Sequence, residues 1–187
     1  MFVNRWAGLL LCWPLAGVAD ESALSQVMQA LAAVPAVETA FREEKTLAVL
    51  DAPLVATGVL YYRAPDFLRK RTLHPHPEDY EADGHWLTVE TPEAGRRQFN
   101  LNGYPQLRPF VEAIRATQAG DQAALARYYQ LEFQGTPADW SLRLTPHDAD
   151  AQRYVAAIVL RGRNGRIDTM ETLEPDGDRS VMTITPR

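Results

Sequence analysis

The sequence predicts a mainly β protein with helices (α+β), folded as one strongly curved antiparallel sheet with helices over its concave face. Short runs of alternating or β-branched residues recur about ten or eleven times between turn signals. Two segments with apolar residues at helical spacing interrupt this series of strands halfway along the chain. Two of the strands, residues 55–62 and 154–160, are apolar on both faces. Such strands are either covered on both sides or line an apolar cavity.

The first 19 residues have the pattern of a secretory signal peptide. Residues 1–5 carry one positive charge, residues 6–15 are apolar with a bend at Pro14, and residues 16–19 are small where a signal peptidase reads. We expect cleavage after Ala19 and a single domain over residues 20–187. The alternatives are a buried helix or a membrane anchor, but the apolar run is too short to span roughly 30 Å of hydrocarbon.

Cysteine content and charge exclude several classes of function. Cys12 lies in the apolar run, and lipidation would need a small residue before it, where Leu11 stands. The cleaved chain would have no cysteine, so disulfides and cysteine-bound metals are excluded. It would hold 18 Lys and Arg against 24 Asp and Glu, a formal charge of −6. This acidity argues against nucleic acid and anionic membrane surfaces as partners.

The first element predicted after the leader is a helix. Ser22 follows two acids and can cap it, and Pro35 ends it. Its apolar stripe repeats at i, i+3, i+4 and i+7 and consists of Leu24, Val27, Met28 and Leu31. We expect these residues either to pack the helix on the sheet or to make it a lid that closes an open sheet.

Five or six strands are predicted next, as a meander. Turns at residues 51–53 and 64–66 contain proline, and Asp83-Gly84 is a strong two-residue hairpin signal. The strands themselves begin at Phe41 and cover residues 55–62, 67–73, 78–82, 85–90 and 96–101.

The middle of the chain is helical. Leu107, Phe110, Val111 and Ile114 form a stripe that starts near Arg108 or Pro109. Gly120-Asp121 stops this helix and caps a second one through Leu125, Tyr128 and Tyr129. This pair is either a packing element or a plug over the concave face.

Five further strands follow the helices. Trp140, Leu142 and Leu144 alternate with polar residues, so one face of their strand is buried, and Asn164-Gly165 is a second hairpin signal. The five cover residues 131–135, 140–145, 154–160, 167–173 and 180–185.

The residues that could carry chemistry do not form a catalytic set. The sequence has no nucleophile elbow, zinc-protease motif or phosphate loop. His74 and His76 could reach one metal ion, but they lie between prolines in a turn. The pairs Asp148/Asp150 and Asp176/Asp178 are explained by turn chemistry. We therefore expect no enzyme activity, no cofactor and no metal.

The order of the motifs resembles the periplasmic lipoprotein carrier family LolA over nearly the whole mature chain. The shared motifs contain Phe41, Lys45, Gly58, Leu60, Tyr62, Pro65, Leu68, Asp83-Gly84, Leu87, Trp140, Leu142, Leu144, Pro146, Gly165 and Ile167. The resemblance implies an unclosed half-barrel with a helical lid. It also implies acyl-chain cargo in a hydrophobic cavity, passed from an inner-membrane donor to an outer-membrane acceptor, without a cofactor.

Two departures from the family pattern indicate a LolA-related paralogue. Ala64 stands where the family has an arginine that latches the lid, and Arg63 would face the other side of the strand. The helical insert is also longer than expected, so the cargo could be another amphiphile.

The predicted binding residues come from two sources. The resemblance implies that Leu60, Tyr62 and Leu68 face the inside of the half-barrel. Pattern alone adds Phe99, Phe110, Ile114, Trp140, Leu142, Leu144, Ile158 and Leu160, any of which could be ordinary core. We expect a monomeric periplasmic carrier for a lipoprotein or acyl lipid. The alternative is a non-transporting or lipoprotein-sensing module that acts through a protein partner.

Overall fold

The computed structural model describes residues 17–104 and 107–187. Within this part of the chain it contains eleven strands. These are β1 (Ala36–Thr46), β2 (Leu54–Arg63), β3 (Phe67–His74), β4 (Glu78–Asp83), β5 (Trp86–Thr91), β6 (Gly95–Asn100), β7 (Tyr129–Thr136), β8 (Asp139–Pro146), β9 (Ala157–Arg163), β10 (Arg166–Leu173) and β11 (Arg179–Pro186). They form one antiparallel sheet in the order β6-β5-β4-β3-β2-β1-β11-β10-β9-β8-β7. The predicted strand number and the predicted unclosed sheet are confirmed.

Four α-helices accompany the sheet in the described residues. They are α1 (Gly17–Ala32), α2 (Arg108–Gln118), α3 (Gln122–Tyr128) and α4 (Ala149–Gln152), and a 3-10 turn covers Leu101–Gly103. Residues 1–16, with Cys12 and most of the predicted signal peptide, lie outside the described part. None of the helices described is both long and apolar enough to cross a bilayer.

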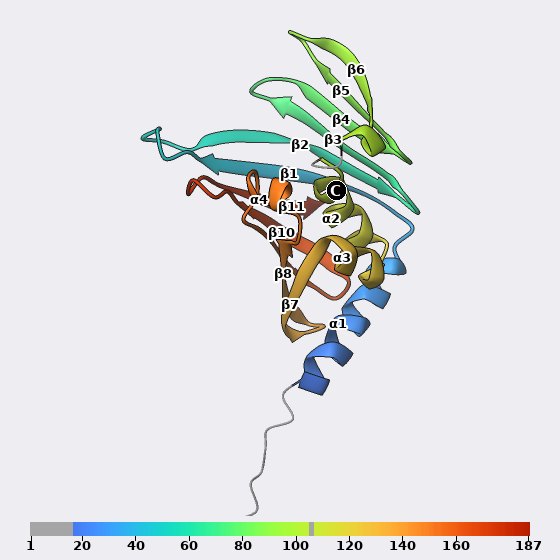
Figure 1. Cartoon of the computed structure of the whole chain (residues 1–187). Coiled ribbons are helices and arrows are strands. Elements are labelled where there is room, and N and C mark those ends of the chain that lie inside the picture. The colour runs from blue at the N-terminus through green and yellow to red at the C-terminus, as the bar shows by residue number, and fades with distance from the viewer. Residues whose placement is uncertain (1–16, 105–106) are drawn as a thin grey trace, which may run out of the picture.

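The pairing of the first and last strands explains where the helices lie. β1 pairs with β11 from Thr39 opposite Pro186 to Thr46 opposite Arg179, which places both at the centre of the sheet. β6 and β7 are therefore the two edges, and the chain between them must cross from one edge to the other. Figure 1 shows α2 and α3 making this crossing on the side toward which the sheet curves.

The register turns two rows of apolar side chains toward the helices. In one half of the sheet, the row runs across β2 to β5 through Tyr62, Leu68, Ala82 and Leu87. In the other half, it runs across β11 to β7 through Met182, Met170, Leu160, Leu142 and Phe133. Directly opposed residues share a face of the sheet. Both rows face inward, because the second packs in the core with the helices and the first lies opposite α2.

The main core fills only one half of the curve. It brings together α1, α2, α3 and strands β7 to β10. Its most buried large side chains are Leu31, Leu125, Tyr129, Trp140, Leu142, Leu144, Ile158 and Leu160. The helices are thus anchored over the β7–β10 half, and α2 extends from there over the β1–β5 half.

Most of the predicted turn and cap signals hold. Ser22 does not cap the first helix as predicted, because α1 already begins at Gly17. Gly120 has a φ of 66° and the Asp121 side chain accepts a hydrogen bond from the Ala124 N–H at 2.8 Å, so the predicted stop and cap are present. At Asp148, where we predicted a plain turn, the same capping chemistry nucleates the single-turn α4. The following strand starts at Ala157 rather than at Tyr154, because the Tyr154 N–H is used to close that turn on the Ala151 carbonyl.

We predict that Gly58→Ala lowers the free energy of unfolding by about 1–3 kcal/mol, the usual cost of overpacking. A Cβ at this position would overlap the Arg71 carbonyl oxygen and lie 2.7 Å from Cε1 of Phe41. Gly103→Ala is the matched control, because a Cβ there would meet no heavy atom within 4 Å. Equal urea midpoints for the two variants would contradict the packing described here.

Candidate functional site

A cavity of about 720 Å³ lies between the sheet and α2. Its floor is the concave face of β1–β5 and β9–β11, and its roof is α2. The floor and roof are mainly apolar and include Leu60, Tyr62, Leu68, Ala82, Leu87, Leu107, Phe110, Val111, Ile114, Leu160, Ile167, Met170, Met182 and Ile184. A space of this size and composition is typical of sites for small apolar ligands.

The roof helix has two different apolar faces. Leu107, Phe110, Val111 and Ile114 recur with helical spacing and line the cavity, where they remain only half-buried. Ala113 and Ala116 are on the face that joins the main core and are buried. Large residues thus cover the open space, while small residues let the helix approach the core closely.

An ion pair interrupts the apolar floor. The Lys70 ammonium donates to the Glu43 carboxylate at 2.5 Å, and the Ser180 hydroxyl donates to its other oxygen at 2.6 Å. Glu43 and Lys70 both line the cavity. Burial raises the pKa of Glu43, but the charge of Lys70 and the hydrogen bonds from Lys70 and Ser180 outweigh this, and the pKa lies below its usual value.

An arginine ties the roof to the sheet. Arg115 of α2 is only 7% exposed, and its Nη1 donates to the Gly84 carbonyl in the β4–β5 turn at 3.0 Å. Its Nε and Nη2 are buried and have no hydrogen-bond partner among the described residues. Arg63, next to Ala64, is exposed and lies over the Phe67 ring at 4.8 Å instead. The hydrogen bond between the roof and the sheet is therefore donated by Arg115 of α2 and not by Arg63 of β2. Only one of the three guanidinium nitrogens of Arg115 takes part in it.

Six of the eleven predicted binding residues line the cavity. They are Leu60, Tyr62, Leu68, Phe110, Ile114 and Leu160. Trp140, Leu142, Leu144 and Ile158 are instead in the main core beneath the helices, away from the cavity. Phe99 pairs with Leu87 and lies on the edge strand β6, where its ring packs edge-on against Tyr104.

The predicted lid residues of α1 are all part of the main core. Leu24, Val27, Met28 and Leu31 are buried there, and α1 packs against β7 and α2. Among the described side chains, none of α1 lines the cavity, and the chain first reaches it at Val34 and Val37. In this structure α2 covers the cavity and α1 supports α2.

Sequence reasoning missed several lining residues. Met170, Met182 and Ile184 line the cavity on the strands beside the predicted set, and so do Glu43 and Lys70. The alternation of β11 could have identified Met182 and Ile184. The Glu43–Lys70 pair could not have been found, because the two residues come from β1 and β3.

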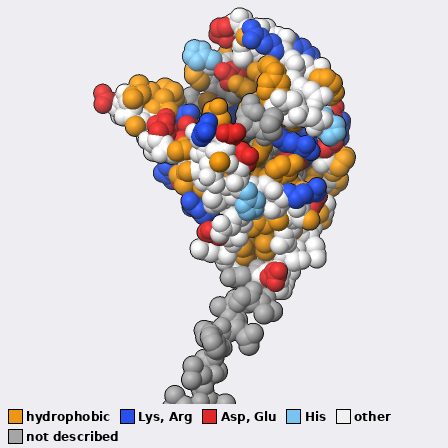
Figure 2. Space-filling view, in the orientation of Figure 1, with side chains coloured by type: hydrophobic (Ala, Val, Ile, Leu, Met, Phe, Trp, Pro, Cys, Tyr) orange, Lys and Arg blue, Asp and Glu red, His pale blue; other side chains and the backbone are white. Residues whose placement is uncertain are grey.

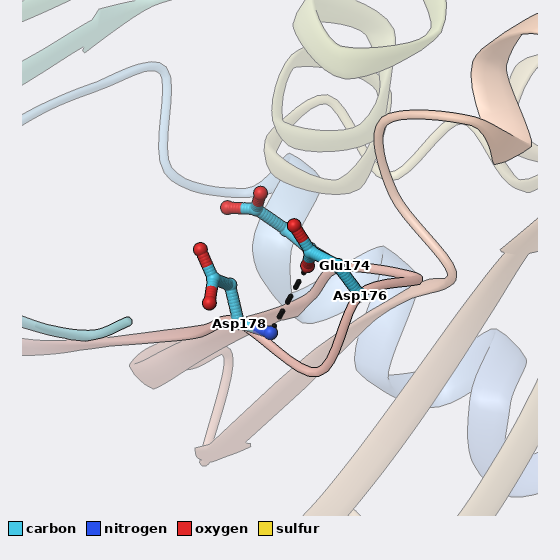
Figure 3. A group of neighbouring side chains, drawn as sticks. All are labelled: Glu174, Asp176 and Asp178. Atoms are coloured by element: carbon cyan, nitrogen blue, oxygen red, sulfur yellow. Dashed lines mark hydrogen bonds between the residues drawn. The ribbon is translucent and has the colours of Figure 1, made fainter. Parts of the chain in front are cut away.

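An acidic cluster lies at the β10–β11 turn. Glu174, Asp176 and Asp178 place carboxylate oxygens within 4.8 Å of one another (Figure 3). Each is used locally: Glu174 pairs with Lys45 at 2.9 Å, Asp176 accepts from the Asp178 N–H, and Asp178 accepts from the Ala48 N–H. The bonds of Glu174 and Asp178 join the turn to the β1–β2 hairpin. The bond from the Asp178 N–H to Asp176 lies within the turn, as turn chemistry predicts.

The β1–β2 hairpin projects from the molecule and carries apolar side chains. Figure 2 shows hydrophobic groups on this projection, at the left of the view. Val49, Leu50, Leu54 and Val55 are exposed, and Val49 is 87% exposed. An exposed apolar cluster on a projection is typical of a contact surface.

The geometry defines a class of protein: a half-barrel whose concave face and roof helix enclose an apolar cavity. A comparison with known families agrees, because the family described as "Outer membrane lipoprotein carrier protein LolA-like" matches residues 16–185. The chain belongs to this LolA-like family. No curated protein matches the chain.

Solved structures with a similar fold are distant in sequence. A DUF1329 family protein from Desulfovibrio piger is 13% identical with a TM-score of 0.52, covering 89% of this chain and 91% of its own. A LolA superfamily protein from Nitrosomonas europaea is 12% identical with a TM-score of 0.44, covering 90% and 93%. A chain of the Pseudomonas aeruginosa MucA/MucB complex is 15% identical with a TM-score of 0.45, and the match covers 87% of this chain and 56% of that chain. At these identities, the similarity concerns the fold alone.

We predict that Glu43→Gln lowers stability at pH 7 by about 1 kcal/mol and flattens its dependence on pH. The folded pKa of Glu43 lies below the ordinary value of 4.5. The pair therefore stabilises the protein above that pH, and its contribution is lost as the pH falls through the folded pKa. Urea unfolding between pH 7 and pH 3 measures this, with Glu93→Gln, an exposed turn residue, as the control. Parallel curves for wild type and Glu43→Gln would show that the pair contributes nothing.

Proposed function

We propose that the protein is a periplasmic carrier that binds the acyl chains of a lipoprotein or another amphiphile in the cavity under α2. The observation that carries this proposal is the apolar cavity, open to solvent at its rim and covered by a single helix. Family membership supports it, since the family is described by a carrier protein. The proposed reaction is binding and release, without covalent chemistry.

The energetics of the cavity favour a ligand of this kind. Burying hydrocarbon is worth about 0.8 kcal/mol for each methylene, so ten methylenes supply roughly 8 kcal/mol before the costs of binding. A dry and rigid void costs about 24 cal/mol for each Å³. At about 720 Å³ that cost would exceed the stability of an ordinary domain. The space must therefore be occupied, hydrated through its polar groups or reduced by movement of α2.

The attachment of the lid is compatible with movement. The core face of α2 is held by α1 and α3, but its contact with the β4–β5 turn includes the one hydrogen bond from Arg115 to Gly84. Two further nitrogens of Arg115 are buried without a partner among the described residues, which costs free energy in the closed state. We propose that α2 moves away from β4 and β5 when cargo enters.

The cellular setting is part of the same proposal. Residues 1–19 would direct export and be removed, leaving residues 20–187 in the periplasm. Cleavage after Ala19 would fall in the first turn of α1, which begins at Gly17. An inner-membrane donor would load the carrier and an outer-membrane acceptor would unload it, with the protein acting as a monomer.

A second candidate function rests on the projecting hairpin. The apolar side chains of Val49, Leu50, Leu54 and Val55 could contact a protein partner, as expected of a non-transporting or lipoprotein-sensing module. In that case the cavity would stay without cargo, and loss of the hairpin side chains would abolish function.

We predict that Leu60→Glu weakens the binding of a long-chain fluorescent fatty acid by at least about tenfold, or 1.4 kcal/mol. A carboxylate in the apolar floor adds a desolvation cost that acyl chains cannot compensate. Val55→Glu is the matched control, because Val55 is on the same strand, faces away from the cavity and is exposed. Native mass spectrometry of the protein purified from periplasm would identify the cargo. Failure of the wild type to take up the fatty acid, or equal binding by Leu60→Glu, would leave the interaction module as the function.

A further inference from the structure

We propose that the β9–β10 turn forms a binding site for an oxyanion at the rim of the cavity, and that it selects amphiphiles with a phosphate headgroup. This inference rests on the proposed function, because it assumes that the apolar chain of the same molecule occupies the cavity. The site consists of Arg163 and Arg166, with Asp168 behind them. Both arginines line the cavity together with Asn164 and Gly165 of the turn.

The two guanidiniums are held by one carboxylate. Nε of Arg163 donates to one oxygen of Asp168 at 2.8 Å, and Nε of Arg166 donates to the other oxygen at 2.8 Å. Burial raises the pKa of Asp168, but the hydrogen bonds and charges of the two arginines outweigh this and lower it, so Asp168 is ionised. Among the described residues, the terminal nitrogens of these two arginines make no hydrogen bond, and the side chains are 58% and 50% exposed. Those nitrogens are the donors that bind phosphate and carboxylate in pairs.

The turn that carries the arginines is well fixed. Asn164 and Gly165 have φ values of 49° and 70°, as in a two-residue hairpin turn. The Asn164 N–H donates to the Pro137 carbonyl at 2.9 Å, and a Cβ on Gly165 would meet Ala30 of α1 at 2.8 Å. Because the turn is wedged between the β7–β8 turn and α1, the arginines are positioned before a ligand arrives, which limits the entropy cost of binding.

The local charge is opposite to that of the whole chain. The protein carries a formal charge of −5, yet this turn offers two arginines to one carboxylate. Asp139 is the other acid that acts on Arg163, and it is the weakest of the influences on that residue. Arg187 and Glu38, also at the rim, pair one to one and add no excess. This local excess of positive charge lies where the headgroup of a ligand with its chain in the cavity would meet water.

The apolar path starts directly beside this site. Ile167 lines the cavity and is next to Arg166 in sequence. Leu160 of β9, which pairs with Met170 of β10, also lines it. An amphiphile could therefore place an oxyanion against the two guanidiniums and its hydrocarbon between the sheet and α2. A neutral headgroup would gain only the apolar part of this contact.

The test compares two lipids that differ only by a phosphate, 1-palmitoyl lysophosphatidic acid and 1-palmitoyl glycerol. Dissociation constants are measured by calorimetry below the micellar concentration, at low ionic strength. For the wild type we expect the phosphorylated lipid to bind about tenfold more tightly. In Arg163→Gln/Arg166→Gln the preference should fall to about twofold or less, with unchanged affinity for the neutral lipid. The single variant Arg166→Gln, which leaves the Arg163–Asp168 pair intact, should lie between.

The controls separate this inference from the carrier proposal. Arg127→Gln/Arg153→Gln removes the same charge from exposed positions that do not line the cavity and should keep the full preference. Equal binding of the two lipids by the wild type, or an equal loss of preference in this control, overturns the headgroup site and leaves the carrier intact. Binding of neither lipid overturns both proposals. Tight binding of inorganic phosphate alone, without a contribution from the acyl chain, would assign the site to a free anion and overturn headgroup selection.

Discussion

The pairing of β1 with β11 is the constraint on which the rest of the structure depends. By joining the first and last strands at the centre, it makes β6 and β7 the two free edges. The chain between those edges has to cross the sheet, and it does so as α2 and α3 on the concave side (Figure 1). The cavity is therefore a consequence of topology: a curved sheet is bridged by helices that are too few to fill it.

The concave face is divided into two halves with different packing. Beneath α1 and α3, side chains from β7–β10, such as Trp140 and Leu144, are buried against the helices. Beneath α2, the residues of β1–β5 face open space. Leu160 is at the boundary, since it belongs to the core and also lines the cavity. α2 is thus anchored in the packed half, and over the other half Arg115 donates one hydrogen bond to the Gly84 carbonyl.

Charged groups lie at three places in and around the cavity: its floor, its roof and its rim. Glu43 and Lys70 neutralise each other on the floor. Arg115 fastens the roof, and two of its buried nitrogens have no hydrogen-bond partner among the residues that the structure describes. The arginines of the β9–β10 turn are at the rim, where water still solvates them. The interior is thus suited to hydrocarbon, and the rim to a charged group.

The sequence by itself determined the local elements of this protein, because alternation, helical spacing and turn residues act over a few neighbours. The hairpins at Gly84 and Gly165, the cap at Asp121 and the stripe of Phe110 and Ile114 were all readable in this way. Only the tertiary structure decided which apolar residues face open space. Trp140 and Leu60 have the same pattern, yet one is core and the other lines the cavity, because α1 and α3 cover one half of the sheet alone. Contacts between distant strands, such as Glu43 with Lys70, likewise depend on strand order, which no local pattern encodes.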